Sequence, residues 1–305
     1  MRLVFLGTPR FAVPSLEAVV TAGHPVLAVV TQPDRPSGRG QHAAAPPVKE
    51  TAQRFGLPVY QPERVRRPEA VEYLRALAPD AMVVVGYGQI IPQNVIDIAP
   101  FGIVNVHGSL LPKYRGAGPV QWAILNGETT TGVTTMRIDA GLDTGDMLLK
   151  AETGIAPEET AVELAARLAE MGADLLVRTL EGLAAGAIVP EKQDAAQATY
   201  APLLKKEDGL IDWSQTAAAI HNRVRGLQPW PGAYTAFRGQ ALHVWRARRL
   251  EMSGAPGRLL SVRPPVVACG EGALELVEVQ LEGRKRMPAS DFANGQRLAE
   301  NEELG

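Results

Sequence analysis

A carboxamide, an imidazole and a carboxylate are the side chains of this sequence that could act together on a carbonyl group. Asn105 and His107 lie at the end of an apolar, strand-like run, and Asp143 follows within the segment Gly-Leu-Asp-Thr-Gly-Asp. An amide N–H can stabilise an oxyanion, while an imidazole and a carboxylate can hold or move a proton. Together these groups suit acyl transfer to an amine. Taken singly, they also have ordinary structural roles as a cap, a core histidine and a turn residue.

The three residues can meet only if the elements around them bring their strand ends together. Short apolar runs alternate with helix-length segments, a pattern typical of parallel strands joined by crossover helices. The runs are Leu3–Leu6, Val26–Val30, Ala81–Val85 and Ile103–Val106, with a further strand expected over Gly132–Asp139. We therefore predict an α/β fold with a doubly wound, mostly parallel, Rossmann-like sheet. Its ligands should bind outside the carboxyl ends of the strands.

The later part of the chain predicts a second domain. A long helix is expected over Glu158–Leu183, between Pro157 and Gly186. Residues 1–186 would form the catalytic domain and 187–206, which lack periodicity, a linker. Residues 207–305 have short alternating runs separated by turn signals, which favour a small OB-like β-barrel. We expect its core to contain Trp213, Trp230 and Trp245.

Composition and motifs exclude several classes of protein. The net charge of −2 means that any nucleic-acid surface must be local, and the lone Cys269 excludes a disulfide framework. The five histidines lack zinc-site spacing, so we expect no metal. No apolar run is long enough for a membrane span, and the chain opens on a strand-like run rather than a signal peptide, so we expect a cytoplasmic protein. Gly7-Thr8-Pro9 matches neither the dinucleotide motif G-x-G-x-x-G nor the P-loop motif G-x-x-x-x-G-K-[ST]. A nicotinamide oxidoreductase is therefore the least favoured of the functions considered.

At these motifs the sequence resembles the methionyl-tRNA formyltransferase family, over essentially its whole length. N-x-H-x-S-L-L-P together with L-D-x-G-D is shared by formyltransferases that use 10-formyltetrahydrofolate. Three further passages point to the branch that acts on tRNA. They are L-V-F-L-G-T-P-x-F-A near the start, T-Q-P-D-R-P-S-G-R-G from Thr31, and I-D-W-S from Ile211 followed by Q-P-W-P-G-A from Gln228.

The resemblance implies a role for each matching position. Asn105, His107 and Asp143 would be the catalytic residues, and the loop Asp34–Pro46 would embrace the acceptor end of the tRNA. The residues implied in binding the folate are Ser109, Leu110, Leu111, Pro112, Gly86, Tyr87 and Gln89. The residues implied in binding tRNA phosphates are Arg35 and Arg39 in the loop and Arg223, Arg225, Arg246 and Arg248 in the second domain.

The implied function is transfer of a formyl group from 10-formyltetrahydrofolate to the α-amine of methionyl initiator tRNA, which supports translation initiation. The expected partners are that tRNA and the folate co-substrate, with no membrane and no metal, and a monomer is expected. Two alternatives stay open. One is a formyltransferase acting on an amino-sugar nucleotide or on glycinamide ribonucleotide, and the basic second domain argues against the latter. The other is a non-enzymatic RNA-binding protein, against which the three intact polar residues argue.

Overall fold

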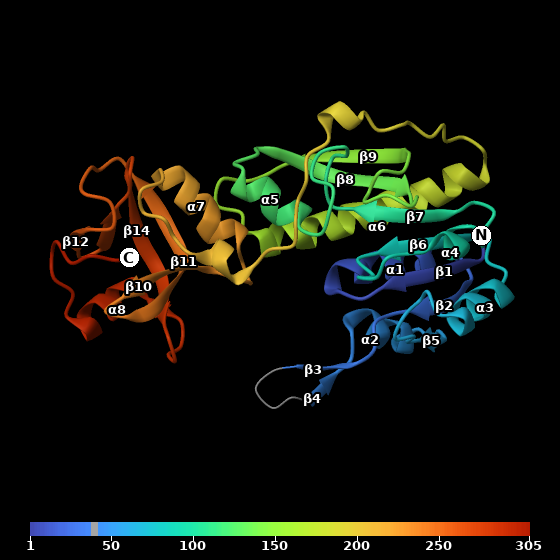
Figure 1. The fold of residues 1–305 in the computed structure, drawn as a ribbon, viewed down its shortest axis with the longest axis horizontal. Coiled ribbons are helices and arrows are strands. Elements are labelled where there is room, and N and C mark those ends of the chain that lie inside the picture. Colours follow the sequence, from blue (N-terminus) through green and yellow to red (C-terminus); the bar gives the residue numbers. More distant parts are fainter. Residues whose placement is uncertain (38–41) are drawn as a thin grey trace. The chain divides into compact units, whose positions relative to one another are not determined.

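The computed structural model describes residues 1–37 and 42–305 (Figure 1). Arg39, predicted to contact tRNA, lies outside the described residues. The chain forms two compact units that alternate along the sequence. Unit 1 comprises Met1–Gly116, Thr130–Gly154 and Ala165–Tyr200, and unit 2 comprises Ala117–Thr129, Ile155–Leu164 and Ala201–Gly305. The predicted division into residues 1–186, 187–206 and 207–305 is not interleaved in this way and stays a prediction.

Unit 1 is built on a seven-stranded sheet with the order β5-β2-β1-β6-β7-β8-β9 (Figure 1). Its strands are β1 (Leu3–Gly7), β2 (Val26–Val30), β5 (Val59–Tyr60), β6 (Ala81–Val85), β7 (Ile103–His107), β8 (Thr130–Arg137) and β9 (Met147–Gly154). The first five are parallel, and β8 and β9 are antiparallel to their neighbours. The predicted mostly parallel sheet is therefore confirmed. The chain leaves β1 toward β2 and returns to β6 on the other side of β1, which makes a topological switch point.

Prolines mark the starts of several helices, because proline fits the first turn of a helix without losing a hydrogen bond. Helices α1 (Val13–Thr21), α2 (Pro47–Arg54), α3 (Pro68–Ala76) and α5 (Pro119–Leu125) each begin in this way. The other helices of this part of the chain are α4 (Gln93–Ile96) and the long α6 (Ala161–Ala184). The predicted long helix is thus confirmed. Within the described part of the chain, no helix is long and apolar enough to cross a membrane.

The segment expected to be a loop after β2 contains a short antiparallel pair, β3 (Arg35–Ser37) and β4 (His42–Ala44). Its base is fixed by Asp34, whose carboxylate lies 2.7 Å from Lys49 Nζ and accepts a 2.7 Å hydrogen bond from Gln61 Nε2. These hydrogen bonds lower the pKa of Asp34. Arg35, the first residue of β3, therefore directly follows a residue that is fixed to unit 1.

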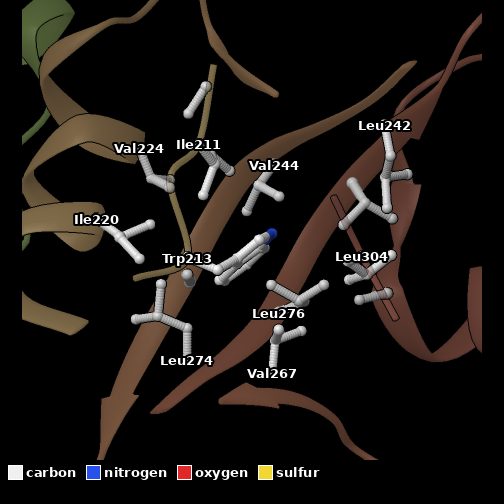
Figure 2. Close-up of a cluster of buried hydrophobic side chains, with 14 of the residues drawn as sticks. Ile211, Trp213, Ile220, Val224, Leu242, Val244, Val267, Leu274, Leu276 and Leu304 are labelled. Carbon is white, nitrogen blue, oxygen red and sulfur yellow. The ribbon is translucent and has the colours of Figure 1, made fainter. Parts of the chain in front are cut away.

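Unit 2 contains an antiparallel sheet with the order β10-β11-β14-β13-β12, to which β15 adds by pairing with β14. The strands are β10 (Ala233–Phe237), β11 (Gln240–Leu250), β12 (Leu259–Val262), β13 (Pro265–Ala268), β14 (Ala273–Leu281) and β15 (Met287–Pro288), with helices α7 (Ala217–Gly226) and α8 (Ala289–Gln296). Figure 2 shows Trp213 at the centre of the buried cluster. Its indole Nε1 donates to Thr235 Oγ1 over 3.0 Å, which satisfies its polar atom. The core position predicted for Trp213 is confirmed, but that for Trp230 is wrong, since Trp230 is 55% exposed.

Helix α6 approaches strands β7 and β8 closely at Gly172. A Cβ atom at this position would lie 2.7 Å from Val106 Cγ1 and 3.4 Å from Val133 Cγ1. Val106 therefore points toward α6. Because side chains alternate along a strand, Asn105 and His107 occupy the opposite face of β7.

We expect Gly172→Ala to destabilise the protein by about 1–3 kcal/mol, the usual range for overpacking. The added methyl would come closer to Val106 than a Cβ atom tolerates, which outweighs the gain of about 1 kcal/mol in helix propensity. Gly295→Ala in α8 is the matched control, because its Cβ would meet nothing within 4 Å. Urea unfolding of the three proteins measures the effect. A Gly172→Ala protein as stable as the Gly295→Ala protein would contradict this packing.

Candidate active site

The end of β7 presents two polar side chains on a strand that is otherwise apolar. Asn105 and His107 are buried and lie opposite Met136 and Thr134 of β8. The side chain of Asn105 makes no hydrogen bond within the described part of the chain, yet the residue keeps 8% of its surface exposed. Its amide is therefore available to a ligand at the carboxyl end of the strand.

The structure brings His107 and Asp143 together, with 3.7 Å between Nδ1 and Oδ2. On the other side of the ring, Nε2 lies 2.9 Å from the carbonyl oxygen of Tyr114. A carbonyl oxygen can only accept, so Nε2 carries a hydrogen. A neutral His107 then has its lone pair on Nδ1, directed toward the carboxylate, and a proton gained on Nδ1 would lie between the two groups. Such a pair can take a proton from a reacting group.

Backbone geometry holds this pair in place. The N–H of Gly116 donates to Asp143 Oδ2 over 2.8 Å. Tyr114 and Asp143 both adopt left-handed conformations, with φ of 63° and 52°. Residues other than glycine rarely adopt this region, and such strain tends to gather at functional sites. The loop that bears Asp143 is closed by Asp139, which accepts hydrogen bonds from Gly141 N and Thr144 Oγ1.

The segment Ser109–Pro112, predicted to bind folate, folds back over β8. Thr134 Oγ1 donates to Ser109 O over 2.7 Å and accepts from Leu111 N over 3.1 Å. The hydroxyl of Ser109 donates to Lys113 O over 2.6 Å, and Leu111 is fully buried. Leu110 and Pro112 keep intermediate exposure. The buried members thus shape the segment, and its folate-binding role stays a prediction.

A cavity of about 580 Å³ opens at the carboxyl ends of β1, β2 and β6. It is lined by Thr8, Pro9, Gln32, Pro33, Arg35, Ala44, Pro46, Gly86, Tyr87 and Gly88. This size is typical of small-molecule sites, and the position matches the switch point of the sheet. Gly86 and Tyr87, predicted to bind folate, therefore lie in one cavity with Arg35, predicted to bind tRNA. Because β6 pairs with β7 in parallel, the cavity and His107 lie at the same edge of the sheet.

Gln89, the remaining residue predicted to bind folate, does not line this cavity. Its side chain accepts from Val65 N over 2.8 Å and donates to Glu63 O over 3.2 Å.

Burial raises the pKa of Tyr87, so its phenol remains neutral. Gln32 Nε2 and Thr8 Oγ1 both donate to the Tyr87 carbonyl, over 3.1 and 3.0 Å. The three strand ends are therefore tied together by hydrogen bonds.

In unit 2 the predicted arginines have different environments. Arg246 and Arg248 are exposed on β11, and Arg248 Nη1 lies 3.4 Å from Glu275 Oε1. Their exposure is compatible with binding phosphates. Among the described residues, no three histidine, cysteine or acidic side chains form a group that could hold a metal.

Arg225 and Arg223, both on α7, are less accessible. Arg225 is buried, its Nη1 donates to Glu159 O over 3.1 Å, and its Nε and Nη2 donate to Asn222 Oδ1 over 3.1 and 2.9 Å. Arg223 is half-buried. The guanidinium of Arg225 therefore holds the backbone of unit 2 in place, and its predicted role in tRNA binding is untested.

Comparison with known proteins identifies the family. The Formyl transferase family model matches residues 1–180, and the model of the formyl transferase C-terminal domain matches residues 203–297. Methionyl-tRNA formyltransferase of Solibacter usitatus is 74% identical, over 100% of this chain and 99% of its own length. That of Koribacter versatilis is 58% identical over the same shares of the two chains. The chain belongs to the methionyl-tRNA formyltransferase family.

Solved structures show that the fold of this formyltransferase is shared. A variant of HypX from Aquifex aeolicus superposes with a TM-score of 0.67 at 18% identity, covering 99% of this chain and 49% of HypX. An N-formyltransferase from Helicobacter canadensis, in complex with folinic acid and dTDP-3-aminofucose, has a TM-score of 0.68 at 18% identity and covers 90% of this chain and 98% of its own. At these identities the likeness establishes the fold alone.

Sequence reasoning missed several residues of this formyltransferase that lie at the site. Thr8 and Gln32 follow β1 and β2 directly, so the rule that ligands bind at the carboxyl ends of parallel strands could have found them. Gln193 lies in a small, polar segment that carries no local signal.

We expect Asp143→Asn in this formyltransferase to lower turnover by roughly 10²–10⁴ while leaving the fold intact. Asparagine tolerates the left-handed conformation and its amide oxygen can still accept from Gly116 N, so the melting temperature should hardly change. Only the negative charge facing His107 is lost. Single-turnover formylation and thermal unfolding measure the two effects. Near wild-type turnover would remove Asp143 from the chemistry.

Proposed function

We propose that this protein transfers a formyl group from 10-formyltetrahydrofolate to the α-amine of methionyl initiator tRNA, as a monomer in the cytoplasm. The single observation that carries the proposal is the meeting of His107 and Asp143 beside Asn105 in a chain of this family. The donor supplies the formyl carbon, and its N–C bond breaks as the new amide bond forms. The amine loses one proton, and the folate nitrogen that leaves gains one.

Each of the three residues has a distinct task in this transfer. The amide of Asn105 donates a hydrogen bond to the formyl oxygen as that oxygen gains negative charge. His107 Nδ1, with its lone pair facing Asp143, receives the proton that the amine releases, and the carboxylate stabilises the resulting imidazolium. A free α-amine has a pKa near 7.7–8.0, so a useful fraction is neutral without a strong base. Alignment of the amine and the formyl carbon is then a main requirement.

The cavity at the ends of β1, β2 and β6 is proposed to hold the parts of the two substrates that lie away from the reacting atoms, because Asn105, His107 and Asp143 lie at the same edge of the sheet but do not line the cavity. Its Gly86 and Tyr87 face a folate, and Arg35 at the base of the β3–β4 hairpin meets the acceptor end of the tRNA. A Cβ atom on Gly86 would lie 2.9 Å from Pro9 Cγ, and the residue has a φ of 56°, so this wall of the cavity requires glycine. Apolar walls with a few polar groups suit a planar heterocycle.

The outer face of the unit 2 sheet is proposed to bind the tRNA backbone. On this face the guanidinium of Arg286 lies 3.6 Å from the centre of the Trp245 ring. The Trp245 ring stacks in turn on His243, with 5.4 Å between the ring centroids and 11° between the ring planes. Burial, followed by the charge of Arg286, lowers the pKa of His243. His243 is therefore a neutral support, and Arg286 is a fixed, exposed cation of the kind that binds a phosphate.

The deciding experiment is a formylation assay with 10-formyltetrahydrofolate and purified protein. Charged initiator tRNA should be the preferred acceptor, while an amino-sugar nucleotide and glycinamide ribonucleotide serve as competing acceptors. Preference for either small amine would replace this proposal with one of the alternatives. No transfer to any acceptor, with tRNA still bound, would support a non-enzymatic RNA-binding protein.

We expect Asn105→Ala to lower turnover by roughly 10²–10³, the range seen when one oxyanion donor is removed. The amide acts as charge develops, so kcat should fall more than KM rises. Steady-state kinetics with charged tRNA measure both constants. An unchanged kcat would show that another group stabilises the oxyanion.

We expect Arg286→Ala to weaken tRNA binding and to reduce the salt dependence of log Kd by about one unit of slope, the loss of one phosphate contact. Arg238→Ala is the matched control. Arg238 also lies over an aromatic ring, that of Phe237 at 4.8 Å, but Glu302 neutralises it at 2.6 Å. Titrations at several salt concentrations measure the slopes. Equal slopes for the two variants would show that Arg286 touches no phosphate.

A further inference from the structure

Gln193 has every hydrogen-bonding position of its amide satisfied, and its oxygen and nitrogen partners all belong to the segments that hold the catalytic pair. One further contact, of 3.9 Å, joins its Nε2 to the sulfur of Met136 on β8. Its Nε2 donates to the carbonyl oxygens of Asp143 and Gly145, each over 2.8 Å. Its Oε1 accepts from Nε and Nη2 of Arg115 over 3.0 and 2.8 Å. A primary amide has two N–H groups and two lone pairs, so Gln193 has no capacity left for a substrate.

Arg115 is the central residue of a tripeptide that touches both members of the pair. The residue before it, Tyr114, accepts from His107 Nε2 through its carbonyl, and the residue after it, Gly116, donates to Asp143 Oδ2. The guanidinium of Arg115 is buried, with 5% of the residue exposed. A shift of Arg115 would therefore move the contacts of the imidazole and the carboxylate together.

The segment that bears Gln193 is itself fixed to both neighbours. Glu191 exchanges two backbone hydrogen bonds of 2.8 Å with Met147, the first residue of β9. Thr199 accepts from Arg115 N through its carbonyl and from Tyr114 N through its hydroxyl, each over 2.8 Å. Residues 191–199 thus bridge the tripeptide and the loop that bears Asp143, and all of these contacts lie within unit 1.

We propose that Arg115 and Gln193 are positioning residues for the catalytic pair: they set the approach of Asp143 Oδ2 to His107 Nδ1. The proposal rests on the proposed function, since it concerns the same reaction. Asp143 has a strained backbone, with φ of 52°, and the two hydrogen bonds from Gln193 flank the strained residue and its turn. Without them the loop can relax, the carboxylate turns from the imidazole, and neither substrate loses a contact.

The test compares Gln193→Ala with Gln197→Ala, a control in the same segment. The exposed side chain of Gln197 donates to Asp194 and to no other residue that the structure describes. We expect Gln193→Ala to lower kcat by roughly 10- to 100-fold, the scale of a displacement of about 1 Å in an active site. KM for charged tRNA and for 10-formyltetrahydrofolate should stay within about twofold. Gln197→Ala should match the wild type in both constants.

A double-mutant cycle separates positioning from a general structural role. In an Asp143→Asn background, Gln193→Ala should cost less than about threefold, because the charge that it positions is already absent. A loss of the same size in both backgrounds would overturn the proposal, and so would a rise in KM with unchanged kcat. If Gln193→Ala does not fold, Gln193→Glu replaces it, since a carboxylate can still accept from Arg115 but repels the two carbonyl oxygens. Wild-type protein that fails to formylate tRNA would instead refute the proposed function.

Discussion

The approach of Asp143 to His107 depends on a backbone conformation that a chain of L-residues adopts reluctantly. Asp143 and Tyr114 both lie in the left-handed region, which costs on the order of 1–3 kcal/mol at each residue. Such a conformation persists only when its surroundings over-determine it. Here the N–H of Gly116 fixes the carboxylate, the carbonyl of Tyr114 fixes the imidazole, and Gln193 fixes the carbonyl of Asp143. The strain is therefore balanced by hydrogen bonds to the groups whose positions matter for proton transfer.

The sheet supplies the rigid part of this arrangement. Strand β7 is fully buried between β6 and β8, and close packing at Gly172 determines which of its faces meets α6. Strand β8 runs antiparallel to β7, so it passes beneath the Ser109–Pro112 segment. There Thr134 of β8 donates a hydrogen bond to the carbonyl of Ser109 and holds that segment in place. Asn105 and His107 thus stand on a fixed strand, and only Asp143 requires a loop to be held. This difference explains why Gly116 and Gln193 contact Asp143 itself, one at its carboxylate and the other at its backbone carbonyl.

The sequence was most informative where a local period determines the outcome. The alternation of a strand placed Asn105 and His107 on one face, and the spacing of apolar runs predicted the sheet and α6. The sequence was least informative where contacts between distant parts of the chain decide whether a side chain is buried or exposed. Trp230 looks like a core residue but is exposed, and Arg225 is buried with its guanidinium donating to the carbonyl of Glu159, an environment that its charge does not reveal. Gln193 lies far along the chain from its partners, so no window of residues could reveal its role.

The same distinction applies to the positive charge of unit 2. The net charge of −2 says little about which arginines could bind a phosphate. That depends on which of them already form an ion pair with a carboxylate. Arg238 lies against Glu302 and Arg248 near Glu275, so each faces a carboxylate. Arg286 instead lies on the face of Trp245, and an aromatic ring orients a guanidinium without cancelling its charge. Arg238 and Arg286 both lie over an aromatic ring, but Arg238 also faces a carboxylate, which is why we propose Arg286 as the phosphate contact.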